Sequence, residues 1–145
     1  MISCTEFIPA YSALFTFLDA RGGTEAVEAF WRYLAKAFLG NLEQLVREQG
    51  LRGCYVYWSR TLREEAADFT LELDEEAKRF RILLHQCPSK KRLLDLKDFQ
   101  SYPDYCRHCD VLYREVLEPL GYNVEVDLSH CDEACCSLTV TPKSF

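Results

Sequence analysis

Five of the eight cysteines lie within one short segment in the second half of the chain, and this concentration constrains the fold more than any other feature. The segment follows the pattern C-x2-C-x21-C-x3-C-C and also holds two of the three histidines. The pattern contains two groups of closely spaced soft ligands, and the residues between them could form one helix and one strand. A folded domain can bring two such groups together around one point. The five residues are Cys106, Cys109, Cys131, Cys135 and Cys136.

Length and composition indicate one soluble domain over residues 1–145. The chain is long enough to bury a core, and its 48% of hydrophobic and 28% of charged residues are typical of globular proteins. The net charge of −6 disfavours phosphate binding, so we expect no nucleic-acid partner. A homo-oligomer is compatible with this composition.

The apolar N-terminal segment 7–20 is too short to span a bilayer, contains Asp19, and is not preceded by basic residues. We therefore expect no membrane partner and a cytoplasmic location. Cytosolic reductants keep thiols reduced, so the cysteines are expected to be thiols, metal ligands or catalytic groups. If the chain were exported, four disulfides would become possible.

Hydrophobic periodicity predicts an α+β fold in which an antiparallel sheet of about four strands, formed by two hairpins, packs against N-terminal helices and one helix from the C-terminal half. Apolar residues three or four apart predict helices at 5–20 (broken at Pro9), 24–49, 51–63 and 103–120. Alternation predicts strands at 68–74, 79–87, 122–128 and 136–141. Residues 51–63 also have some strand character, and residues 89–102 are expected to be a polar connector.

The cysteine spacing predicts a metal site. Cys106 and Cys109 would start a helix, where the dipole favours thiolates, and Cys131 and Cys136 would approach from the second hairpin. His130 is the alternative ligand. His108 lies on a different face of its helix from the two cysteines, so we expect it to contact solvent or to hydrogen-bond to a metal ligand rather than to bind the metal itself. Mixed Cys and His favour zinc, with an iron–sulfur cluster as the alternative. A set of reactive or redox thiols, or inert buried thiols, are the other interpretations.

A second hypothesis concerns catalysis. Cys87 closes a predicted strand two residues after His85, so both side chains are expected on the same side of that strand. Such a pair could form an activated nucleophile and its base.

Residues 80–140 resemble the L-2-amino-thiazoline-4-carboxylate hydrolase-like family and, more distantly, the 4-vinyl reductase type of small-molecule-binding domain. The resemblance rests on a cysteine that closes a strand, a Cys-and-Asp helix start, a Pro-Leu-Gly helix end and paired cysteines around the last turn, namely Cys87, Cys106, Cys109, Asp110, Pro119, Leu120, Gly121, Cys131 and Cys136.

The resemblance implies an α+β domain with a pocket for a small organic ligand and, in the vinyl-reductase type, a zinc held by three cysteines and a carboxylate. Here Leu128 replaces the carboxylate, which leaves Asp127, His130 or Cys135 to complete a site, and Ala134 and Cys135 stand where the final turn has a glycine. The resulting hypothesis is a metal-containing, hydrolase-like protein. The alternative is a non-enzymatic, metal-stapled sensor or accessory binding module.

Overall fold

The computed structural model describes residues 4–144 and confirms the α+β fold class. The helices are α1 (Cys4–Phe38), α2 (Gly40–Gln49), α3 (Leu51–Glu64), α4 (Pro88–Asp95) and α5 (Arg107–Leu117), with short 3₁₀ turns at Glu118–Leu120 and Cys131–Glu133. The strands are β1 (Asp68–Asp74), β2 (Arg79–Gln86), β3 (Tyr122–Asp127) and β4 (Cys136–Pro142). They form one sheet in the order β1-β2-β4-β3.

The sheet consists of the two predicted hairpins, which pair antiparallel through β2 and β4. In the first hairpin turn the Asp74 carboxylate accepts a hydrogen bond from the Ala77 N–H at 2.8 Å, and Lys78 adopts the left-handed conformation. The register aligns one apolar row across all four strands. This row, on the helix-covered face, is Leu71, Ile82, Leu138 and Val126.

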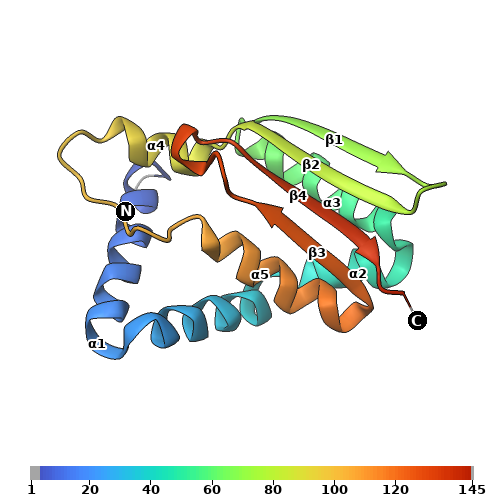
Figure 1. Ribbon diagram of the computed structural model, residues 1–145, viewed down its shortest axis with the longest axis horizontal. Helices are drawn as coiled ribbons and strands as arrows, with labels where there is room; N and C mark the ends of the chain where they lie inside the picture. Colours follow the sequence, from blue (N-terminus) through green and yellow to red (C-terminus); the bar gives the residue numbers. More distant parts are fainter. Residues whose placement is uncertain (1–3, 145) are drawn as a thin grey trace.

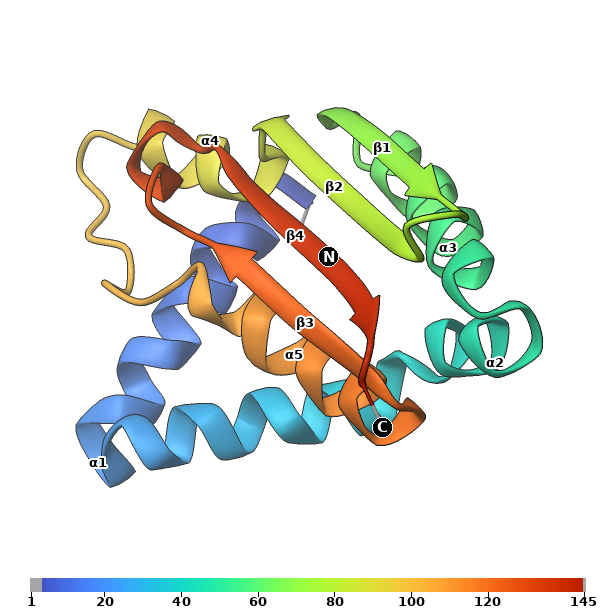
Figure 2. The same ribbon diagram turned by 45° about the vertical axis from the view of Figure 1, so that its right-hand side comes forward.

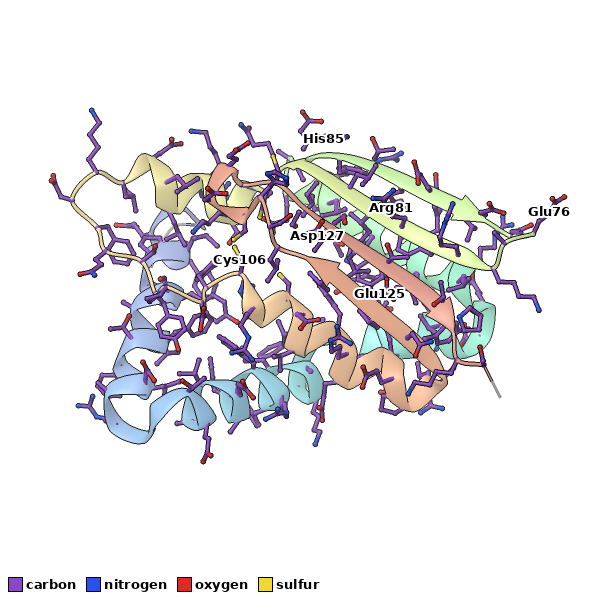
Figure 3. The ribbon with its side chains drawn as sticks, in the orientation of Figure 1. Glu76, Arg81, His85, Cys106, Glu125 and Asp127 are labelled. Atoms are coloured by element: carbon purple, nitrogen blue, oxygen red, sulfur yellow. The ribbon has the colours of Figure 1, made fainter. Side chains whose placement is uncertain are left out.

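Helices α3 and α5 cover one face of the sheet, and the other face is open (Figure 1). The open face is polar and carries Arg81, Glu125 and Asp127 (Figure 3). On the covered face, the ring of Trp58 from α3 stacks on Phe80 from β2, with centroids 5.5 Å apart. This layer is the larger of two cores and includes α2.

Helix α1 bends into two arms and lies against α5 and α4 rather than on the sheet (Figures 1 and 2). The bend falls at Gly22 and Gly23, where Gly23 has a φ of 67°, so the predicted helix end at these glycines is confirmed. The arms enclose a second, aromatic core. Ser12 is fully buried there, and its hydroxyl accepts a hydrogen bond from the Tyr102 N–H at 2.8 Å.

Some predicted boundaries were wrong. Pro9 does not break the helix, because it lies in the second turn, where its missing N–H removes one hydrogen bond at most. The predicted helix 24–49 is interrupted at Leu39, which leaves Phe38 75% exposed instead of buried. The supposed connector begins with α4, since Pro88 suits a first helical position. Helix α5 begins at Arg107 rather than at residue 103.

Candidate functional site

A cavity of about 290 Å³ lies where the sheet, α3, α5 and the first arm of α1 meet. Its walls are mainly apolar and include Trp58, Ile82 and Leu138. Thiols recur along this wall: six of the eight cysteines line it, namely Cys87, Cys106, Cys109, Cys131, Cys135 and Cys136. The predicted gathering of thiols is therefore found, around a cavity.

The two remaining cysteines were expected to have packing roles. Cys54 fits this prediction, because it is fully buried in the larger core and burial raises its thiol pKa to about 12. The side chain of Cys4 lies outside the described residues.

Two turns carry the thiols to the cavity. Cys106 immediately precedes α5 and Cys109 lies in its first turn, as predicted, and Figure 3 shows Cys106 between α5 and the β3–β4 turn. In that turn Ala134 is buried in the left-handed conformation, with a φ of 59°. Its carbonyl accepts a hydrogen bond from the Cys87 N–H at 2.7 Å, which ties the start of α4 to the cysteines around it.

The structure does not bring the His85 imidazole to Cys87. The register of β1 and β2 skips His85, because Asp68 pairs with Gln86 and Phe69 with Leu84. This bulge breaks the alternation on which the prediction relied. The His85 side chain is exposed, with its Nε2 2.8 Å from the Thr70 hydroxyl, whereas Cys87 lines the cavity and burial raises its thiol pKa.

The proposed metal ligands do not converge on one point. Within residues 4–144, no three His, Cys, Asp or Glu side chains lie close enough together to hold a metal ion. Cys106, Cys109, Cys131 and Cys136 share the cavity wall, but His130 is exposed and lies off that wall. Sulfur donors suit zinc, but the four thiols would have to move closer together to coordinate one ion.

The helix start does not lower the thiol pKa values as expected. Burial raises the pKa of Cys109 to about 12, and the nearby Asp110 carboxylate adds to the effect. Burial and the neighbouring thiols raise the pKa of Cys136 to about 12, and the pKa of Cys106 is also raised by burial and by Cys131. Desolvation therefore outweighs the helix dipole, and these thiols are neutral at pH 7.

His108 is the site residue that the sequence prediction missed. Its Nδ1 contacts the Tyr105 carbonyl oxygen, and its Nε2 lies 3.4 Å from Cys109 Sγ. Because a carbonyl oxygen only accepts, Nδ1 must carry the proton, which leaves Nε2 to accept from the thiol. Burial lowers the His108 pKa to about 4, so the ring is neutral. The imidazole also packs against aromatic rings, with the Tyr105 centroid at 4.7 Å.

The sequence contained part of the signal for His108. It places His108 beside Cys109, but on a different face of α5 from the two cysteines. That face is covered by the first arm of α1, whose Tyr11 ring lies 5.5 Å from the imidazole. Nothing local to α5 indicates this cover.

Other polar groups at the cavity are mostly uncharged. The hydroxyls of Ser89 and Tyr105 lie 2.7 Å apart and hydrogen-bond to each other. The charged side chains on the wall are Lys90, which is half-buried, and Glu65, which is exposed. The cavity therefore suits a neutral, largely apolar molecule.

No protein-family model matches the chain, and no curated protein matches it significantly. Among the helices of residues 4–144, none combines the length and hydropathy needed to span a membrane.

Proposed function

We propose that this protein binds a small, neutral, mainly apolar organic molecule in the cysteine-lined cavity. The supporting observation is the cavity itself, a partly open space of about 290 Å³ that six cysteines line. Pockets for organic ligands are concave and mostly apolar with a few placed polar groups, and their volumes begin at about 300 Å³. A cavity of about 150 Å³ already accommodates benzene in another protein, so one substituted ring would fit here.

A binding experiment with a blocked cavity tests this proposal. Leu84 lines the cavity, whereas its neighbour Leu83, which pairs with Thr70 and Ser137, does not. We expect benzene to bind the native protein and the Leu83→Trp variant, as measured by calorimetric titration, and Leu84→Trp to abolish the binding. Equal binding by both variants, with both folded by circular dichroism, would place the ligand elsewhere and contradict the proposal.

The hydrolase-like activity suggested by the family resemblance is the finer form of this proposal. It requires a nucleophile or an activated water molecule at the cavity, and neutral thiols at the wall are candidates for the former. A non-enzymatic sensor or accessory module would use the same cavity without chemistry. A cytoplasmic location and a homo-oligomeric state are compatible with both and stay predictions.

A second candidate function is zinc binding by Cys106, Cys109, Cys131 and Cys136, with an iron–sulfur cluster as the alternative. The observation that favours it is that these half-buried thiols share one cavity wall and lie near enough for ionisation of one to raise the pKa of another, as for Cys106 and Cys131. A cation among them would favour the thiolates. Elemental analysis and an absorption spectrum of protein purified without oxygen test it. This second candidate predicts one zinc per chain without visible absorption. Brown absorbance would indicate iron–sulfur, and metal-free folded protein would contradict both.

A further inference from the structure

We propose that Cys109 and His108 form a nucleophile–base pair that acts on a small, neutral acyl compound held in the cavity. The inference rests on the proposed function, because the compound must occupy the same cavity. It assigns the covalent chemistry to Cys109 rather than to Cys87, and it places Cys109 outside a closed metal site.

Three groups are placed as a nucleophile, its base and an orienting acceptor. Cys109 Sγ lies 3.4 Å from His108 Nε2, within reach of an S–H···N hydrogen bond. The other ring nitrogen of His108 is held by the Tyr105 carbonyl, which fixes the tautomer and aims the Nε2 lone pair at the thiol. Nucleophile, base and orienting acceptor are thus present, and such sites are recognised by geometry rather than by sequence position.

Cys109 also differs from the other cavity thiols in having an imidazole beside it. His108 is the histidine that lines the cavity, whereas His85 and His130 are exposed and lie off the wall. Cys136 shares the cavity and is half-buried like Cys109, but among the described residues it has no imidazole partner. Proximity to an imidazole, and not burial, therefore distinguishes Cys109.

The substrate class follows from the surroundings of the pair. The aromatic rings around the imidazole and the apolar walls disfavour an ionic ligand. A neutral ester or amide carbonyl is electrophilic enough for a thiol and carries no charge into the cavity.

The reaction needs only the acyl compound and water. The S–H bond of Cys109 breaks as Sγ bonds to the carbonyl carbon, and His108 Nε2 takes the proton. That proton passes to the leaving oxygen or nitrogen as its bond to the acyl group breaks, which gives a thioester on Cys109. Water then attacks the thioester, Nε2 takes a proton from the water, and this proton returns to the departing sulfur.

Per-residue labelling rates test the pair. Protein purified without oxygen is treated with iodoacetamide at pH 7, with and without chelator, and the rate at each cysteine is measured by mass spectrometry for the native chain and for His108→Gln. We expect the Cys109 rate to fall about 100-fold in His108→Gln, as for loss of a general base, while the Cys136 rate is unchanged. A Cys109 rate that does not depend on His108, or labelling of Cys109 only after chelation, would overturn the proposal.

Two measurements on unsubstituted His108 avoid the risk that His108→Gln fails to fold. The ¹⁵N spectrum of histidine-labelled native protein should show His108 protonated at Nδ1 and unprotonated at Nε2, and the opposite tautomer would overturn the pair. Phenyl acetate should transfer one acetyl group to Cys109, and none to the Cys109→Ser variant. Acetylation at other cysteines alone would overturn the assignment.

The benzene titration separates this inference from the function on which it rests. If benzene binds and is excluded by Leu84→Trp, but Cys109 reacts independently of His108, the pair is wrong and the binding function stands. If benzene does not bind, both are wrong.

Discussion

Replacing Ser12 by alanine should destabilise the protein by about 1.5 kcal/mol, because it removes the acceptor that holds α1 to the chain segment before α5. Ser12 is fully buried, and its Oγ accepts from the Tyr102 N–H at 2.8 Å. Leaving that backbone N–H buried and unpaired costs about 1–3 kcal/mol. Alanine recovers about 0.5 kcal/mol through its higher helix propensity, which reduces a mid-range cost of about 2 kcal/mol to about 1.5 kcal/mol.

Thr16→Ala is the matched control on the same helix. Thr16 is exposed, and its hydroxyl reaches the Ser12 carbonyl at a weak 3.5 Å, so its loss should change stability by less than about 0.5 kcal/mol. Urea denaturation at pH 7 gives both free energies of unfolding. If Ser12→Ala costs no more than Thr16→Ala, the buried hydrogen bond does not fasten α1 in this way.

Two further predictions concern the larger core. Gly53→Ala should destabilise the protein by about 3 kcal/mol, because a Cβ there would lie 2.2 Å from the Leu45 carbonyl oxygen in α2, whereas Gly40→Ala, with no atom within 4 Å, should be neutral or stabilising in thermal melts. Equal melting temperatures would refute this close approach of α3 to α2. The second concerns pH: burial raises the pKa of Cys54 from 9.0 to about 12. The protonated thiol therefore contributes its full stability below pH 9, and the contribution is lost as pH rises towards 12. Between pH 7 and pH 10 the native protein should lose about 1.4 kcal/mol more than Cys54→Ala in urea denaturation, and identical losses would contradict the assignment.

The sequence predicted the sheet well because its strands have one wet face. Alternation along β1 and β3 marks which residues face the helices, and the register of both hairpins agrees with it. The glycine pair at the bend of α1 was equally informative, since Gly23 adopts a conformation that other residues rarely take. The preference for a helix at residues 51–63 is confirmed by α3.

The site was predicted only in part, because its decisive features are not local. The grouping of thiols followed from spacing, but the bulge at His85 depends on pairing with β1, which places His85 on the surface. The role of His108 depends on α1 covering α5, a contact between residues far apart in the chain. The effect of burial on the pKa of Cys109 likewise depends on the assembled cavity.

A crystal of the protein soaked in iodobenzene tests the central claim most directly, because the anomalous signal of iodine locates the ligand. We expect an iodine peak inside the cavity, bounded by Cys109, Tyr113 and Leu138, in the native protein. An empty cavity, with iodine only at exposed surface aromatics such as Phe17 or Phe38, would contradict the claim that the thiol-lined cavity is the binding site.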